Sequence, residues 1–369
     1  MRGRTLAASA SRHTSQPLNE TLIFVNEYKH ESKIRAVVTG TGRDLPDQIW
    51  TSEMVEARVN RESHGWTIPN DIIRMAAGVV ERRYAPDGTS SSELAARAAS
   101  RALDESGLDP QAIDLLIFAS ASHDVAEPAT ANMLQASVGC GNAAVMDVKN
   151  ACNSFLNGLE VAHAFIETGR ASRVLVAAGE RLSPTIKWNI ADNNDLAARL
   201  AALTLGDAGA AFVLEASVER ERGLFPGAFE SDGRHWELST VLGGGSLYGG
   251  EPDRMFFECR SAKLQQLAVE RVPRLVEQVL LKLDWSLDDV ALVVPHQVSR
   301  SVIHRVAKLL GFPPDRCMVT LDRFGNTAAA SIPLAFDVAR DEGRIVPGDK
   351  VLLVGGAAGF SAAVIPIVL

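Results

Sequence analysis

The chain has 369 residues, of which 46% are hydrophobic, and this is enough to bury a large core in one big domain or two half-sized ones. Its net charge of −8 comes from dispersed acids without a basic stripe, which argues against a nucleic-acid partner. The sequence has no apolar run of about 18 residues and no signal-type N-terminus, so neither a membrane span nor secretion is expected.

Alternating strands and helices are expected from Ile34 onward, after a polar N-terminal extension over residues 1–32. A buried strand should occupy 34–42, and a helix should occupy 90–107, starting at serines and ending at glycine. The next expected elements are a strand at 113–122, a helix at 129–139, and strands at 143–148, 173–180 and 210–217. Apolar strands that alternate with helices indicate an α/β fold whose sheet is covered on both faces.

Two pairs of apolar segments repeat at one offset along the chain. Residues 113–120 (IDLLIFAS) resemble 290–297 (VALVVPHQ), and 173–179 (RVLVAAG) resemble 350–356 (KVLLVGG), both offset by 177 residues. A shared offset, with similar flanking turns, predicts a duplicated α/β unit. We therefore expect an N-terminal half over 33–217 and a C-terminal half over 218–369, with the active site between them.

Cys152, His296 and Asn326 each follow an apolar stretch. Cys152 also precedes an amphipathic helix, whose first unpaired N–H groups should favour the thiolate. The three residues together indicate nucleophilic catalysis on an acyl group. Alone, a buried cysteine is usually a small core residue and a Gly-Asn pair is usually a turn. The four cysteines are scattered without a CxxC pair, which predicts no metal site and favours a reducing cytoplasm.

Six ordered motifs cover the chain from about Ile34 to the C-terminus. They are GVVERRY (78–84), Asn150-Ala151-Cys152, LGDAGAAFVL (205–214), Pro295-His296-Gln297, Gly325–Ser331 and GGAAGFSAAV (355–364). Together they resemble the thiolase superfamily, and most of all β-ketoacyl-acyl carrier protein synthase III, although Ala208 replaces one glycine. The resemblance implies a thiolase-like duplicated fold, layered α-β-α-β-α with two mixed sheets.

In such an enzyme Cys152 attacks an acyl thioester and holds the acyl group. The backbone N–H groups of Cys152 and Gly356 are the expected oxyanion donors, since glycine lets a backbone approach the substrate closely. The His296 Nε2 atom and the Asn326 amide would then stabilise the enolate of a second thioester.

Several relatives within the superfamily differ from this chain. Thiolases carry a second catalytic cysteine in the C-terminal glycine loop, which here is 355–359 and holds no sulfur. Chain-elongating synthases use Cys-His-His, whereas the third group here is Asn326. Acyltransferase relatives often lose this asparagine because they form no enolate, so its presence favours carbon–carbon bond formation.

The residues that usually bind coenzyme A in this family are replaced in this chain. Synthases that prime with acetyl-CoA clamp its adenine between a tryptophan and an arginine. Ile72 and Thr185 stand at those places here, and Ala76 stands where the early turn would carry its arginine. Lys187 and Trp188 are nearby candidates for substrate binding, with a plain loop as the alternative.

Glu127 precedes Pro128 in a segment that is longer than in typical synthases III. This resembles olefin-pathway enzymes that join two acyl-CoAs without decarboxylation, in which the glutamate acts as a base across the dimer interface. A carboxyl group in an apolar channel would have a raised pKa suited to proton abstraction. The alternative is a solvated loop acid.

The predicted protein is a cytoplasmic, homodimeric condensing enzyme in fatty acid, polyketide or related metabolism. It would join a Cys152-bound acyl group to a malonyl or second acyl thioester, carried by coenzyme A or acyl carrier protein, and would need no other cofactor. One alternative is an acyltransferase that acts on oxygen or nitrogen of a small molecule. Another is a non-catalytic partner subunit, against which the three intact site residues argue.

Overall fold

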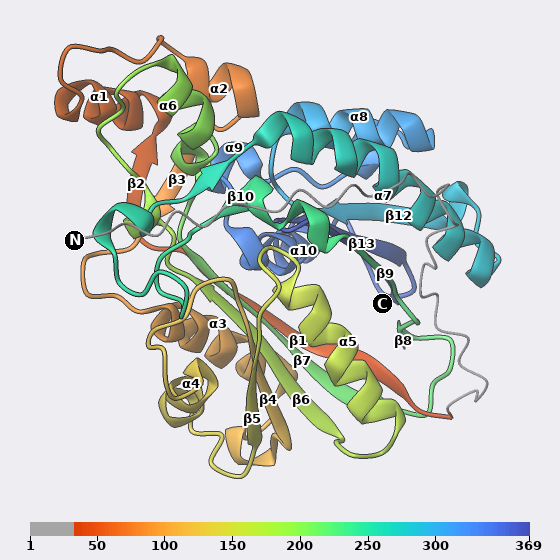
Figure 1. Ribbon diagram of the computed structural model, residues 1–369. Coiled ribbons are helices and arrows are strands. Elements are labelled where there is room, and N and C mark those ends of the chain that lie inside the picture. Colours follow the sequence, from red (N-terminus) through yellow and green to blue (C-terminus); the bar gives the residue numbers. More distant parts are fainter. Residues whose placement is uncertain (1–32) are drawn as a thin grey trace, which may run out of the picture.

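Two mixed five-stranded sheets form the centre of the computed structural model, which describes residues 33–369 (Figure 1). The strands of the first sheet lie in the order β1 (Arg35–Asp44), β7 (Ala208–Ser217), β6 (Arg173–Glu180), β4 (Leu115–Ala119) and β5 (Ala144–Val148). The second sheet contains β12 (Val290–Pro295), β13 (Lys350–Ala357) and β14 (Ser361–Val368), with β8 (Gly223–Leu224) and β9 (Ala228–Ser231) both paired to β14. The extension expected over 1–32 lies outside the described residues.

The two sheets repeat one strand arrangement. In the first, β4 and β6 are parallel and β6 and β7 are antiparallel; in the second, β12 and β13 are parallel and β13 and β14 are antiparallel. The segments that match in the sequence are thus corresponding strands, β4 with β12 and β6 with β13. Helices α5 (Ser154–Glu167) and α10 (Ser331–Asp341) also correspond, since they begin at the same 177-residue offset.

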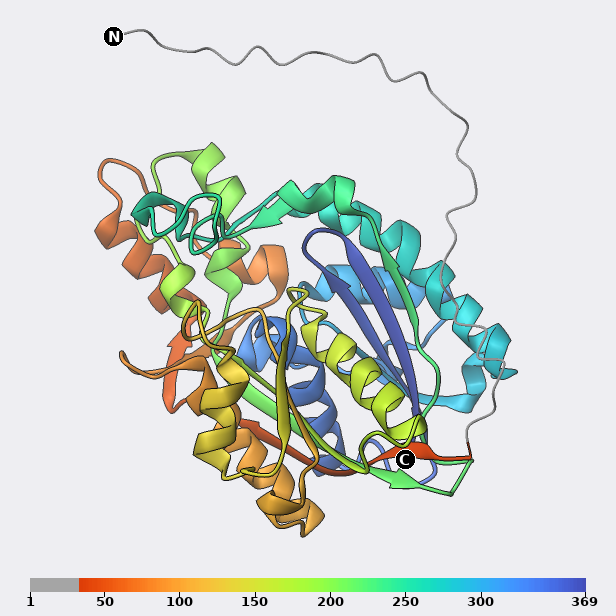
Figure 2. The same cartoon turned by 60° about the horizontal axis from the view of Figure 1, so that its bottom comes forward.

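Helices cover both sheets and fill the space between them. Helices α3 (Ser91–Ser106) and α4 (Thr130–Val138) pack on the outer face of the first sheet. Helices α7 (Ser261–Leu283) and α8 (Arg300–Leu310) pack on the outer face of the second. Helices α5 and α10 lie between the sheets, as Figure 2 shows, and complete an α-β-α-β-α thiolase-like fold.

Alternation along β6 explains how one strand serves two layers. Val174 and Val176 belong to the central core with α5 and α10, whereas Leu175 and Ala177 pack with α3 on the other side. Successive side chains of a strand point to opposite faces, so an uninterrupted apolar run is needed when both faces are covered. This is why the strands of both sheets read as continuous apolar segments.

A small subdomain stands above the first sheet in Figure 1. It contains β2 (Gln48–Thr51), α1 (Ser52–Glu62), α2 (Ile72–Ala77), β3 (Glu81–Tyr84) and α6 (Asn193–Arg199), around one apolar cluster. Arg82 is fully buried and holds it together by donating to the carbonyl oxygens of Trp50 and Leu203, at 3.2 and 2.9 Å.

The short α9 (Leu321–Phe324) and the pair β10 (Ser239–Thr240) and β11 (Glu258–Cys259) complete the fold. None of the helices within residues 33–369 has the length and apolar character needed to cross a membrane.

Candidate active site

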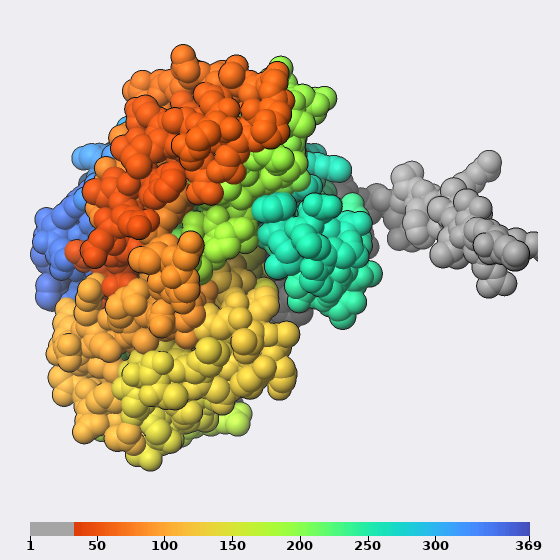
Figure 3. Space-filling model, turned by 90° about the vertical axis from the view of Figure 1, so that its left-hand side faces the viewer, coloured from red at the N-terminus to blue at the C-terminus, as the bar shows by residue number. Residues whose placement is uncertain are grey.

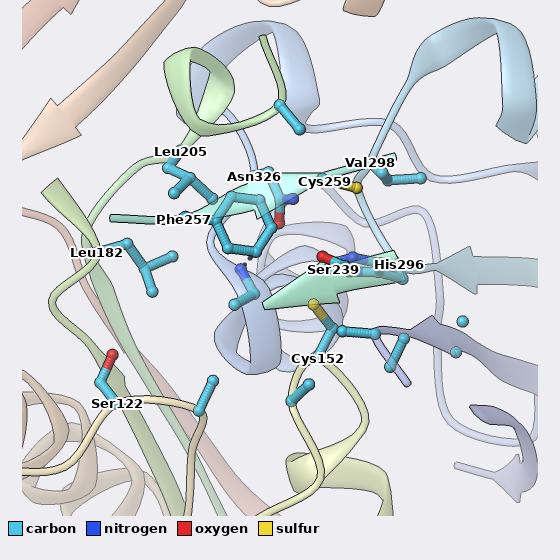
Figure 4. Close-up of a pocket in the computed structure, with 18 of the residues that line it drawn as sticks. Ser122, Cys152, Leu182, Leu205, Ser239, Phe257, Cys259, His296, Val298 and Asn326 are labelled. Atoms are coloured by element: carbon cyan, nitrogen blue, oxygen red, sulfur yellow. Dashed lines mark hydrogen bonds between the residues drawn. The ribbon is translucent and has the colours of Figure 1, made fainter. Parts of the chain in front are cut away.

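A pocket of about 890 Å³ lies where the two halves meet, and Cys152, His296 and Asn326 all line it (Figure 4). Cys152 comes from the loop between β5 and α5, His296 directly follows β12, and Asn326 follows α9. Three residues spread over 175 positions of the sequence are therefore brought to one space. Figure 3 shows the molecule from the side on which the segment around 240–255, in teal, stands beside a hollow next to the orange and yellow loops of the first half.

The Cys152 loop is a strained turn held by its own helix. Ala151 has φ 47°, a left-handed conformation that costs a non-glycine residue about 1–3 kcal/mol. The Ser154 hydroxyl donates to the Ala151 carbonyl at 2.7 Å and accepts from the Asn150 N–H at 2.8 Å. These contacts hold Cys152 two residues before Ser154, at the N-terminal end of α5.

The thiol of Cys152 is not a preformed thiolate, contrary to the expectation from its place before a helix. Burial raises its pKa to about 12, and the nearby Glu180 carboxylate and Cys259 thiol add to the increase. The backbone N–H groups of Cys152 and Ala358 oppose this by hydrogen bonding to the sulfur. Desolvation outweighs the helix terminus, so the sulfur must lose its proton to a base when it attacks.

His296 is suited to take that proton. Its backbone N–H donates to the Val354 carbonyl at 2.8 Å, and its Nδ1 lies 2.7 Å from the Ser331 hydroxyl. Burial lowers its pKa to about 4, so the ring is neutral near pH 7. A hydroxyl can donate or accept, so Ser331 is compatible with Nε2 either as a proton acceptor or as a hydrogen-bond donor.

Asn326 is placed by a turn that requires glycine before it. Gly325 has φ +67°, and a Cβ there would lie 2.5 Å from the Thr204 carbonyl oxygen. The Asn326 backbone N–H donates to that same oxygen at 2.9 Å. Its side-chain Oδ1 accepts from the Ala328 N–H at 2.9 Å, so the amide Nδ2 is the group left to donate to a ligand.

The backbone N–H groups of Cys152 and Gly356 stay the predicted oxyanion donors, and both residues line the pocket. The N–H of Ala358, two residues further along, acts on the Cys152 sulfur and lowers the pKa of the thiol. Asn153 fixes this loop to α5, because its Nδ2 donates to the carbonyl oxygen and the hydroxyl of Ser361 at 3.1 and 2.9 Å.

Glu180 is a residue of the site that the sequence analysis overlooked. Its carboxylate is fully buried and accepts from the N–H groups of Ala121, Ser122 and Ala329 and from the Ser122 hydroxyl, at 2.6–3.2 Å. It thereby joins the loop after β4 to the loop that carries Asn326. Burial raises its pKa, and these hydrogen bonds oppose the increase. The available signal was an acid directly at the end of the apolar segment RVLVAAGE.

Lys187 and Trp188 do not line the pocket. The Lys187 ammonium pairs with Asp195 at 3.2 Å, and the Arg58 guanidinium stacks 3.9 Å from the Trp188 ring. Trp188 also packs against Trp50 in the core of the small subdomain. Both side chains are engaged within the protein, and the expectation that they bind substrate stays a prediction.

Glu127 is exposed at the surface, next to Ala126, which lines the pocket. Its carboxylate is not part of the lining of this chain's own pocket. The expected role across a dimer interface stays a prediction. Among residues 33–369, no group of three or more His, Cys, Asp or Glu side chains is arranged to hold a metal ion.

Comparison with known proteins agrees with this geometry. Residues 146–233 match the family 3-Oxoacyl-[acyl-carrier-protein (ACP)] synthase III, and residues 280–367 match the C-terminal family of the same enzyme. The chain is 35% identical to beta-ketoacyl-[acyl-carrier-protein] synthase III of Rhizorhabdus wittichii, over 89% of this chain and 97% of the relative. Identity is also 35% to the Cereibacter sphaeroides protein of that name, with 90% and 99% covered.

Solved structures share the fold. The 3-oxoacyl-(acyl carrier protein) synthase III of Pseudomonas aeruginosa has a TM-score of 0.81 at 29% identity, with 90% of this chain and 98% of that chain covered. A structure of OleA from Xanthomonas campestris has a TM-score of 0.83 at 24% identity, with 92% and 100% covered. The second likeness concerns the fold alone.

Proposed function

Because the chain belongs to the β-ketoacyl-[acyl-carrier-protein] synthase III family, whose reaction is a Claisen condensation, we propose that Cys152 holds the acyl group during that reaction. The observation that carries the proposal is the meeting of Cys152, His296 and Asn326 in one pocket. The protein is thus a condensing enzyme, an acyltransferase of the 3-oxoacyl-ACP synthase III type.

The loading step uses the first half of the site. The Cys152 sulfur attacks the thioester carbonyl while the neutral His296 ring accepts the thiol proton at Nε2. The N–H groups of Cys152 and Gly356, two residues that line the pocket, stabilise the oxyanion of the tetrahedral intermediate. The carrier thiol leaves with the proton, and the acyl group remains on the sulfur as a new thioester.

The condensation step uses the second half of the site. His296 Nε2 and Asn326 Nδ2 donate to the thioester oxygen of the second substrate and stabilise its enolate. With a malonyl thioester, the bond to its carboxylate breaks, CO₂ leaves and the electron pair becomes the enolate. The α-carbon attacks the acyl carbonyl on Cys152, the bond from that carbonyl to sulfur breaks, and the β-ketoacyl thioester leaves. The Cys152 thiolate takes a proton from solvent. Each donor of this kind is worth about 2.7–4 kcal/mol of barrier, so neither residue is dispensable.

One mass-spectrometric experiment tests this function. The protein is incubated with an acyl-CoA, then with malonyl-CoA or malonyl-ACP, and both protein and products are measured. A condensing enzyme gains the acyl mass on Cys152 and then releases a β-keto product. A protein that loads but releases a product only to an oxygen or nitrogen acceptor is an acyltransferase of the same fold, and one that never loads is a partner subunit.

A second route is favoured by the position of Glu127. Its neighbour Ala126 lines the pocket and its own side chain is exposed, so a second copy of the chain could receive this carboxylate. A base would allow two ordinary acyl thioesters to condense without loss of CO₂. In that case Glu127→Ala loses acyl-CoA self-condensation and keeps Cys152 acylation. The second route would be excluded if Glu127→Ala kept full activity with a malonyl donor and the wild type formed no product without one. The decarboxylative route would then stand.

We propose a homodimer assembled along β5. This edge strand of the first sheet leaves Val145, Met146 and Val148 only half-buried in the single chain, although all three are apolar. An unpaired apolar edge strand is a ready template for another chain. The substrates on this proposal are phosphopantetheine thioesters of coenzyme A or acyl carrier protein, and the enzyme acts in the cytoplasm.

A further inference from the structure

The pocket does not end at the three site residues but continues into the second half as an arm between α7, α8 and the outer face of the second sheet. We call this the helical arm and define it by the lining residues of α7 and α8 with Val293 and Val354 beneath them. Val293 belongs to β12 and Val354 to β13, which directly precede His296 and the glycine loop. The arm therefore starts beside the catalytic residues.

The two helices present regular apolar stripes to the arm. On α7 the lining positions 268, 272 and 276 are four residues apart, and on α8 the positions 302, 306 and 310 are also four apart. Residues at this spacing lie on one helix face. They are Ala268, Val272, Val276, Val302, Val306 and Leu310. These stripes carry no charge and no hydroxyl group, and the polar lining residues of α7, Ser261 and Gln265, lie in its first two turns.

An apolar space of this kind is unusual in the core of a protein. Interiors are close-packed, and voids larger than a water molecule are few. Water gains little in a space without polar partners, whereas an alkyl chain there loses its unfavourable contact with solvent. Pockets that bind small molecules have the same size range and apolar lining as this one.

The length of the arm indicates the length of its occupant. Eight residues of α8 separate Val302 from Leu310, a rise of about 12 Å at 1.5 Å per residue. Three bonds of an extended chain span about 3.6 Å, or about 1.2 Å per bond. An extended alkyl chain therefore needs roughly ten carbons to follow this face.

We propose that the helical arm binds the alkyl chain of the acyl group on Cys152, and that the enzyme loads acyl thioesters of roughly ten carbons in preference to acetyl. The inference rests on the proposed function, because it requires an acyl group on Cys152. It also assigns chain-length selection to helices α7 and α8 instead of to loops at the pocket mouth.

Val306 is the position at which this is best tested, since it lies in the middle of the α8 stripe. Val306→Trp should shorten the arm by placing an indole across it, and Val306→Ala should widen it. The matched control is Leu309→Trp, which adds the same side chain on the outer face of α8, where Leu309 is 57% exposed. Melting temperatures of the variants show whether each still folds.

The measurement is the ratio of decanoyl to acetyl loading on Cys152, taken by intact-protein mass spectrometry with decanoyl-CoA and acetyl-CoA. Each methylene that loses burial lowers binding about fourfold, so losing two or more should lower the ratio at least tenfold in Val306→Trp. Val306→Ala should keep or raise the ratio, and Leu309→Trp should match wild type. Should Val306→Trp fail to fold, dodecanoyl-CoA loading in Val306→Ala decides the matter by rising above wild type.

Two results would overturn the inference by itself. One is a wild-type protein that loads acetyl but not decanoyl, which leaves the proposed function standing. The other is an unchanged ratio in both Val306 variants. If neither acyl group labels Cys152, the proposed function fails, and the inference fails with it.

Discussion

Helices α5 and α10 are the same element in two copies of one unit, yet their first residues do different work. Ser154 begins α5 and holds the strained turn before Cys152, and Ser331 begins α10 and holds the ring of His296. The sheets differ as well, because the first continues past β4 into the half-exposed β5, whereas the second ends at β12 and carries the short β8 and β9 on its other side. Where the two copies match, they provide the scaffold. Where they differ, they provide the nucleophile, the base and the walls of the pocket.

The two halves differ most at Cys152, because only the first half has a nucleophile at this turn. Cys152→Ser should abolish stable acyl labelling and lower turnover by at least about 10⁴-fold, since a serine hydroxyl is a weaker acid than the thiol and a weaker nucleophile. Intact-protein mass spectrometry measures the label. Cys140→Ser, Cys259→Ser and Cys317→Ser should keep it, and a label that persists in Cys152→Ser would sink the mechanism.

A substitution of Asn326 should separate the loading step from the condensation step. Asn326→Ala should slow condensation by about 10²–10³-fold, because only that step passes through an enolate that needs the amide donor. Loading should stay within a few-fold of wild type. The two half-reactions are followed separately, as acyl mass gained on the protein and as β-keto product released. Equal effects on both steps would remove the enolate role from Asn326.

Ser331 tests whether the second copy's serine truly serves the histidine. Ser331→Ala leaves a buried ring nitrogen without its partner, which costs about 1–3 kcal/mol, so both half-reactions should slow by roughly tenfold to a hundredfold. Ser331→Thr keeps the hydroxyl and should recover part of the rate. If the alanine variant is as active as wild type at pH 7, His296 is held by its backbone and packing alone.

Glu180 joins loops of the two halves, and its effect should be the smallest. Glu180→Gln removes a negative charge that raises the pKa of Cys152, so the pKa of the thiol should fall and its iodoacetamide alkylation at a fixed pH below that pKa should speed up by several-fold. The alkylation rate as a function of pH should shift toward lower pH. Glu160→Gln is the matched control, since burial also raises the pKa of Glu160, which lies on α5. An unchanged profile would mean that Glu180 is neutral.

The fold could be predicted because its signals are local and repeated. The helix expected at 90–107 runs from Ser91 to Ser106, with a capping box at Ser90 and Glu93. The shared offset of the apolar segments likewise predicted the correspondence between β6 and β13. Such signals depend on neighbouring residues and therefore appear in the sequence itself.

The electrostatics and the pocket walls could not be read in this way. The pKa of Cys152 depends on burial beneath the second half, and the donor at Ala358 depends on how the β13–β14 hairpin folds over it. Trp188 reads as a free aromatic in a loop, but its partners Trp50 and Arg58 are more than 100 residues away in the chain. Properties set by distant contacts need the three-dimensional structure.

The backbone N–H of Ala358, which acts on the Cys152 sulfur, has a consequence for anyone who maps this site by mutation. Alanine scanning skips position 358, and most other side chains placed there leave the amide proton where it is. This contact with the nucleophile therefore goes undetected in a conventional scan, however complete. Only a change to the backbone itself, such as Ala358→Pro or an amide-to-ester replacement by protein semisynthesis, removes the donor. A position of this enzyme that tolerates side-chain substitution can therefore still contribute to the site through its backbone.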